Sequence, residues 1–189
     1  MFEGIAPLLL RLYLAPVMIQ AGWNKYQSFE GIVDWFGNTD YGLGLPFPLV
    51  LAFLATAAEL LGGILLLLGL ATRWISIPLM VTMLVAAFSV HYPHGWTAIA
   101  DASSWMSDGT IILNEAVMNA PDKLAAAKGI LQEHGNYEWL TSSGKLVVLN
   151  NGIEFAITYF IMLFSLFFSG GGKYTSVDYF LAKKFIAKP

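Results

Sequence analysis

The 189-residue sequence contains no cysteine and few charged residues. Without cysteine the chain has no disulfide, thiolate metal site, c-type haem attachment or thiol nucleophile. Charged residues make up 12% of the chain and hydrophobic residues 57%, whereas ordinary soluble domains carry roughly 25% charged residues. The net charge of −3, with scattered lysines, leaves no basic surface for nucleic acid. We therefore expect an all-α membrane protein in which any redox role uses a bound cofactor or a partner protein.

Four apolar segments predict an antiparallel bundle of four transmembrane helices within a single membrane domain, residues 1–189. A bilayer core about 30 Å thick requires about 20 apolar residues per helix. The first segment does not resemble a secretory signal, because MFEG has no basic residue and Arg11 interrupts the apolar run. The predicted helices cover residues 5–23, 48–70, 74–92 and 151–169, with a long structured outer loop at 93–150 and a tail at 170–189.

Two shorter helices are expected outside the bundle. Ala120–His134 begins with Pro121 and is followed by Gly135, a pattern typical of helix ends. Asp178–Ile186 is amphipathic, suits the membrane surface, and has Asp178 at the position of an N-terminal cap. Residues 26–45 are rich in glycine and aromatics and predict a loop.

The distribution of lysine and arginine predicts the orientation. Residues 26–45 contain neither residue, whereas the tail contains Lys173, Lys183, Lys184 and Lys188. Both termini are therefore expected in the cytoplasm of a bacterium, with a multi-pass inner-membrane protein exposing residues 26–45 and 93–150 outside.

Glu59 lies about midway along the second apolar segment, between Pro48 and Arg73. An ionisable group near the bilayer centre costs at least roughly 2.5–3.5 kcal/mol, so it is expected to face protein or trapped water and to be functional. Small residues share its helical face, which permits close approach of another helix and also a homodimer. This stripe comprises Ala52, Ala55, Gly62 and Gly63.

Other polar residues predict a pocket around Glu59 that opens to the outside. Lys25, His91 and His94, and Glu154 lie at the outer ends of the first, third and fourth helices, with Glu59 about half a membrane deeper. Arg11 is expected below Glu59 and within reach of it. Helical spacing places Arg11 and Lys25 on one face, together with Ala15, Met18 and Gly22.

Each of these residues has a structural interpretation beside the functional one. Glu59 forms an ion pair with Arg11 or Lys25, or it accepts protons and hydrogen bonds at a quinone head group. His91 and His94 bind loop backbone, or they hold copper, iron or zinc with Glu154 or Asp101 as a third ligand.

Several motifs resemble the DoxX family of small four-helix inner-membrane proteins. They are Arg11, the AGWNK run at Ala21–Lys25, the ELLGGILLLLGLATR run at Glu59–Arg73, His91, and the GGKYTSVD run at Gly171–Asp178. The resemblance implies a subunit or accessory of a quinone-linked oxidoreductase, as in thiosulfate:quinone oxidoreductase, or a membrane partner of oxidative-stress enzymes. For that role we expect Glu59, His91 and Glu154 to handle protons, and Arg11, Lys25 and Gln20 to join Glu59 and His91 at the quinone.

A narrower resemblance concerns DoxX-type members encoded with copper-binding, ribosomally made peptides. The phrases RLYLAPV, AGWNKY, GLGLPFP, ATRWISIPLM and HGWTAIAD carry it. It implies peptide-maturation proteins as partners. The alternatives are a non-catalytic membrane anchor that docks partners through residues 93–150 and the tail, and a copper-handling membrane protein.

Overall fold

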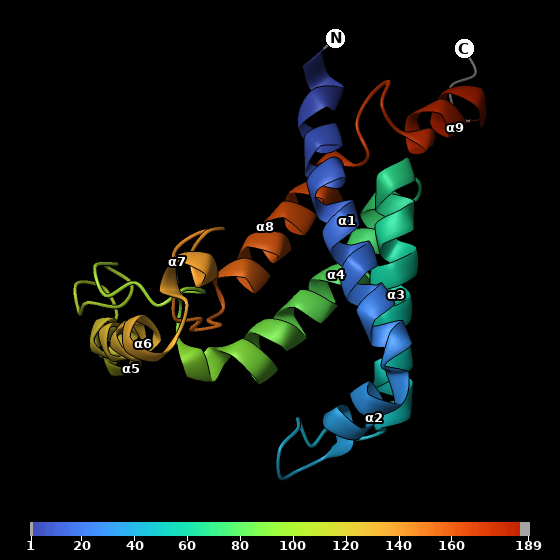
Figure 1. The fold of residues 1–189 in the computed structure, drawn as a ribbon. Helices are drawn as coiled ribbons and strands as arrows, with labels where there is room; N and C mark the ends of the chain where they lie inside the picture. The colour runs from blue at the N-terminus through green and yellow to red at the C-terminus, as the bar shows by residue number, and fades with distance from the viewer. Residues whose placement is uncertain (1, 186–189) are drawn as a thin grey trace. The chain divides into compact units, whose positions relative to one another are not determined.

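The computed structural model describes residues 2–185, whose regular elements are helices, with no β-strand among them (Figure 1). The chain divides into two compact units, Met1–Val85 with Ala156–Pro189, and Ala86–Phe155. The single membrane domain expected from the sequence stays a prediction. The helices of the first unit are η1 (Phe2–Gly4), α1 (Ile5–Gln27), α2 (Phe29–Gly37), α3 (Pro48–Leu68), α4 (Thr72–Val85), most of α8 (Glu154–Ser169) and α9 (Val177–Phe185).

Three helices in the described part of the chain are long and apolar enough to cross a membrane. They are Ile5–Gln27, Pro48–Leu68 and Thr72–His94, where α4 continues into the π-helix η2 (Ala86–His91) and the 3₁₀ turn η3 (Tyr92–His94). The protein is therefore a multi-pass membrane protein. At 16 residues, α8 is about 24 Å long, shorter than the bilayer core of about 30 Å.

Helices α1 and α3 pack closely because glycines remove side chains from their contact. A Cβ on Gly22 of α1 would lie 2.4 Å from the backbone nitrogen of Leu60, and one on Gly63 of α3 would lie 2.7 Å from Ile19. The contacts ascend along α1 as they descend along α3, so the two helices are antiparallel. The predicted close approach at the small-residue stripe is confirmed, with Gly63 against α1.

One apolar core joins four helices of the first unit. Its buried members come from α1, α3, α4 and α8: Leu14, Ala15, Met18, Leu66, Leu79, Met83, Leu163 and Leu166. Apolar side chains on the opposite faces of the spans are exposed, with Leu9 and Phe53 among them. This arrangement suits helices that are packed on one side and face lipid on the other.

The segment after α1 differs from the expected loop. Helix α1 extends to Gln27, and the short helix α2 occupies Phe29–Gly37, with Phe36 buried. The predicted loop is therefore wrong over these nine residues. Residues 38–45, which connect α2 to α3, contain no helix.

The segment after α8 turns back and fastens the start of α4. The Asp178 carboxylate accepts hydrogen bonds from the backbone N–H groups of Ala71 (2.6 Å) and Thr72 (2.9 Å). The Oγ of Ser176 accepts the N–H of Tyr179 instead (3.2 Å). The expected tail helix forms as Val177–Phe185, but Asp178 caps α4 rather than its own helix. Ile186, its predicted last residue, lies outside the described residues.

The second unit closes on itself where residues 95–98 meet residues 150–154. The side-chain amide of Asn150 donates to the carbonyl of Thr97 (2.6 Å), and the N–H of Gly152 donates to the same carbonyl (3.0 Å). Three helices lie between these ends: α5 (Glu115–Met118), α6 (Ala120–His134) and α7 (Tyr137–Leu140). The predicted structured loop and its helix at Ala120–His134 are confirmed.

Candidate functional site

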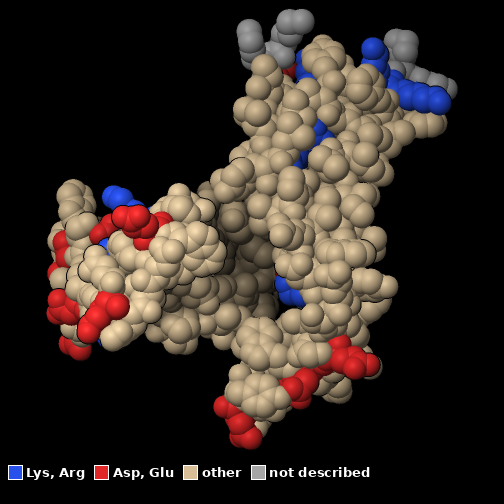
Figure 2. Space-filling model, viewed as in Figure 1, with Lys and Arg blue, Asp and Glu red and all other residues tan. Residues whose placement is uncertain are grey.

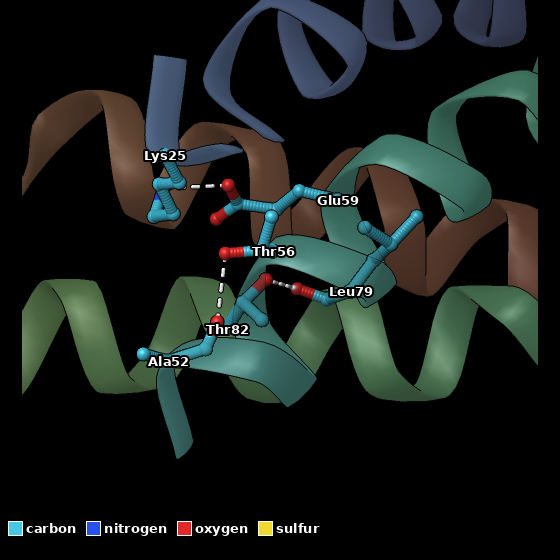
Figure 3. Close-up of polar contacts among 6 residues, drawn as sticks. All are labelled: Lys25, Ala52, Thr56, Glu59, Leu79 and Thr82. Atoms are coloured by element: carbon cyan, nitrogen blue, oxygen red, sulfur yellow. Dashed lines mark hydrogen bonds and ion pairs between the residues drawn. The ribbon is translucent and has the colours of Figure 1, made fainter. Parts of the chain in front are cut away.

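Lys25 and Glu59 form an ion pair between α1 and α3 (Figure 3). The Lys25 Nζ donates to Glu59 Oε2 at 2.5 Å, and the two side chains are 24% and 5% exposed. Lys25 lies in the last turn of α1 and Glu59 near the middle of α3. The pair is possible because Gly22, one turn before Lys25, lets α1 contact the backbone of Leu60.

Two threonine hydroxyls lie beside this pair (Figure 3). Thr56, one turn before Glu59 on α3, is buried and donates its hydroxyl to the carbonyl of Ala52 at 2.7 Å. Thr82 of α4 donates to the carbonyl of Leu79 at 2.8 Å. Each hydroxyl donates its proton to a backbone carbonyl of its own helix. Its oxygen lone pairs therefore remain to accept a hydrogen bond.

Arg11 does not pair with Glu59. Its guanidinium donates to the carbonyls of Leu66 at 3.4 Å and Thr175 at 2.7 Å. Because α1 and α3 are antiparallel, Arg11 lies beside the far end of α3. The expectation that Arg11 supports Glu59 from below is therefore wrong, and Lys25 is the partner. Arg11 instead holds the segment that precedes α9.

The depth assigned to Lys25 also changes. The sequence predicted Glu59 about half a membrane below Lys25, yet the two side chains are in direct contact. Because α1 continues to Gln27, Lys25 is still part of the helix and lies alongside α3. Gln20 is exposed on α1, and no hydrogen bond joins it to Lys25 or Glu59 within residues 2–185. Its role at a cofactor stays a prediction.

His91 and His94 lie at the start of the second unit. His91 Nδ1 is 2.8 Å from the carbonyl oxygen of Asn151, as the structural interpretation of this residue predicts. The carbonyl of His94 accepts the side-chain amides of Asn114 (2.9 Å) and Asn150 (2.8 Å). Among residues 2–185 the structure brings no three His, Asp or Glu side chains together as metal ligands.

Glu154 and Asp101 bind protein groups in the second unit. Glu154 Oε2 accepts a hydrogen bond from the N–H of Ala98 at 2.9 Å. This bond links the first residue of α8 to the backbone of residues 95–98. Asp101 accepts the N–H and hydroxyl of Ser103, at 2.9 and 2.6 Å. These hydrogen bonds lower the pKa of Asp101. A proton-handling role for His91 and Glu154 stays a prediction.

The sequence patterns did not predict that Thr56 and Thr82 lie at this site. Thr56 lies three residues before Glu59, so its helical position was a usable signal. Thr82 had none, because it reaches the site through the packing of α4 against α3.

Residues 6–92 match the DoxX family. The matched segment covers slightly less than half of the chain. It contains Lys25, Glu59 and both threonines, as well as Arg11 and His91. The long segment of the second unit after Tyr92 and the GGKYTSVD run lie outside the matched residues.

Two curated bacterial proteins are similar to this chain. One, from Bacillus subtilis (strain 168), is named "Putative oxidoreductase CatD" and is 35% identical over 86 residues, 46% of this chain and 60% of its own length. The other, an uncharacterized protein from Haemophilus influenzae, is 29% identical over 98 residues, 50% of this chain and 62% of its own length. The chain thus spans about 60% of the length of these relatives. No solved structure matches the chain.

Proposed function

We propose that this DoxX-family protein is a quinone-linked accessory subunit of a membrane oxidoreductase system. The observation that carries the proposal is the Lys25–Glu59 ion pair, set beside two hydroxyls within largely apolar helices. Charged groups inside a membrane segment are costly and mark proton or ligand sites. The similarity to a protein named as an oxidoreductase supports the same class of function.

The residues around the pair fit a quinone head group in their chemistry. Lys25 has two further N–H donors and a partly exposed side chain, which suits a carbonyl oxygen. A bound quinone would supply two-electron, two-proton redox chemistry that this cysteine-free chain lacks. Lys25 would orient the head group, and Glu59 would hold or pass a proton at its carboxylate.

The electrons would come from a partner protein. We propose an oxidoreductase or a set of peptide-maturation proteins in this role, the latter on the narrower resemblance of phrases such as AGWNKY. The protein would lie in the bacterial inner membrane with both termini in the cytoplasm. There α8 would complete an antiparallel four-helix bundle with the three longer spans.

Glu59→Gln tests the proton role, because it keeps the shape and a hydrogen bond to Lys25 but removes the charge. Hydrogen bonds to charged groups contribute about 1.5–3 kcal/mol. We therefore expect about tenfold less quinone to leave with the purified protein on solvent extraction, and slower quinone-dependent activity of the partner. Glu30→Gln, an exposed acid on α2, is the matched control. Unchanged quinone content and activity in Glu59→Gln would contradict the proposal.

A non-catalytic anchor is the second candidate, favoured by the apolar surface of the second unit. Trp105, Trp139 and Leu149 are 68%, 70% and 71% exposed. Replacing both tryptophans by alanine discriminates the two functions. An anchor would lose its partner in a co-purification experiment while any bound quinone stays.

A further inference from the structure

A hollow of about 520 Å³ lies in the first unit where α4 begins and α8 ends. The α3–α4 turn, the turn after α8 and α9 surround it, and all three lie at the end of the unit that carries the N-terminus (Figure 1). Its lining includes Arg73, Trp74, Gly170, Lys173, Asp178 and Tyr179.

Arg73 faces this hollow without a protein partner. It is exposed and makes no hydrogen bond or ion pair with any residue between 2 and 185. Its side chain lies over Gly170, where a Cβ would be 3.2 Å from its Nε. A guanidinium that is held along one side and open on the other is suited to bidentate binding of a phosphate.

The second cation of the hollow is Lys173. Its ammonium bonds Glu3 Oε2 at 3.2 Å, but both side chains are exposed, 45% and 74%. The hydrogen bond to Glu3 raises the pKa of Lys173, so the ammonium remains charged near neutral pH. Exposed ion pairs are worth at most about 1 kcal/mol, so an anion in the hollow can compete with Glu3 for this side chain.

The acidic residue of the hollow is already used by the protein. Both carboxylate oxygens of Asp178 accept backbone N–H groups, from Ala71 and Thr72. Buried Arg11 also interacts electrostatically with it. The negative charge of Asp178 is therefore partly compensated. Arg73 is then the unpaired positive charge at the opening, and Lys173 shares its charge with Glu3.

The position of the hollow indicates where the anion comes from. The long spans Pro48–Leu68 and Thr72–His94 meet at this end, and Trp74, at the start of α4, is 77% exposed. Exposed Trp and Tyr beside the end of a span are typical of the membrane–water interface. Basic pockets between transmembrane helices at this depth bind lipid phosphates.

We propose that this hollow binds the phosphate of an acidic phospholipid head group in the adjacent leaflet. Arg73 takes the phosphate oxygens, Lys173 adds a second cation, and Trp74 and Tyr179 cover the glycerol region. A soluble phosphate shares the charge chemistry but has no group to contact the two aromatic rings.

The test is binding to the detergent-solubilised full chain, measured by native mass spectrometry. The probes are short-chain phosphatidylglycerol, short-chain phosphatidylcholine and inorganic phosphate. We expect one phosphatidylglycerol to bind in preference to both other probes. Arg73→Gln should weaken it about fivefold, the effect of one basic residue at an anionic lipid surface, and Arg73→Lys should retain most of the binding.

Lys184→Gln is the matched control, because it removes one positive charge from the same end of the unit but from outside the hollow. Equal losses in Arg73→Gln and Lys184→Gln would overturn the site in favour of diffuse attraction. Equal binding of the two lipids, or binding of inorganic phosphate as tight as that of phosphatidylglycerol, would overturn the lipid assignment. Lys173→Gln provides a second variant if Arg73→Gln does not fold.

Discussion

The Lys25–Glu59 pair lies where neither charged side chain is well solvated by water. Glu59 is 4% exposed, and its helix offers apolar neighbours apart from Thr56. Removing one partner of a buried ion pair leaves an uncompensated charge, which costs about 3–5 kcal/mol, whereas replacing both partners by apolar residues is often neutral or stabilising. The pair therefore adds little net stability, although the loss of either partner is costly.

This energetic asymmetry predicts a specific pattern of stability. Lys25→Met should destabilise the protein by about 3–5 kcal/mol, because Glu59 loses its cation. The double variant Lys25→Met/Glu59→Leu should recover most of that loss. Denaturant unfolding of the protein in micelles measures both values. The single variant Glu59→Leu is measured as well. If the double variant is as unstable as the sum of the two single variants, the two residues are not coupled.

Among the elements of the first unit, the segment from the end of α8 through the first turn of α9 binds the other helices. Arg11 of α1 holds its Thr175 carbonyl, and Asp178 caps the N-terminus of α4. Gly69 allows the arrangement, since a Cβ there would lie 1.7 Å from the Arg11 guanidinium. One short segment thus joins α1, the end of α3 and the start of α4.

Removing the Asp178 carboxylate, which caps α4, should weaken the attachment of this segment to α4. Loss of a helix N-cap costs about 0.5–2 kcal/mol. Asp178→Ala should therefore raise, about 2- to 30-fold, the population in which this segment is detached from α4. Trypsin cleavage after Lys173, Lys183 and Lys184 should accelerate by the same factor, provided that the segment detaches and reattaches faster than trypsin cleaves it. Asp122→Ala, which removes an acid from the first turn of α6, is the control. Equal cleavage of Asp178→Ala and the native protein would contradict the role of Asp178.

At the scale of the whole molecule, charge is distributed unevenly along the first unit. Figure 2 shows acidic side chains over α2 and basic ones at the end that carries α9. The α2 region, residues 26–45, has Glu30, Asp34 and Asp40 without Lys or Arg, and α9 carries Lys183 and Lys184. This asymmetry agrees with an orientation in which α9 lies in the cytoplasm.

The absence of cysteine makes this orientation directly measurable. Gly31 and Gly129 have open space around an added Cβ, so Gly31→Cys and Gly129→Cys should fold normally. A membrane-impermeant maleimide should label both in intact spheroplasts, and Lys184→Cys only after permeabilisation. The native chain, which has no thiol, is the blank. Labelling of Lys184→Cys in intact spheroplasts would reverse the proposed topology.

Helix positions were predictable because each depends on residues close together in the chain. The span at Pro48–Leu68 and the helix at Ala120–His134 follow from local hydropathy and from the residues at their ends. Helix α2 was missed because nine residues that include three aromatics and two glycines do not distinguish a short helix from a loop. The π-helical turn at Ala86–His91 likewise has no signal in the local pattern.

Local hydropathy was enough to predict that this protein is helical, crosses a membrane and places one carboxylate, Glu59, within an apolar span. The packing of the helices was needed to show that Lys25 rather than Arg11 neutralises Glu59, and that Asp178 caps α4 rather than α9. The physical reason is that hydropathy and helical period describe one helix at a time. The partner of a charge depends on the register between helices, which close contacts at Gly22 and Gly63 set.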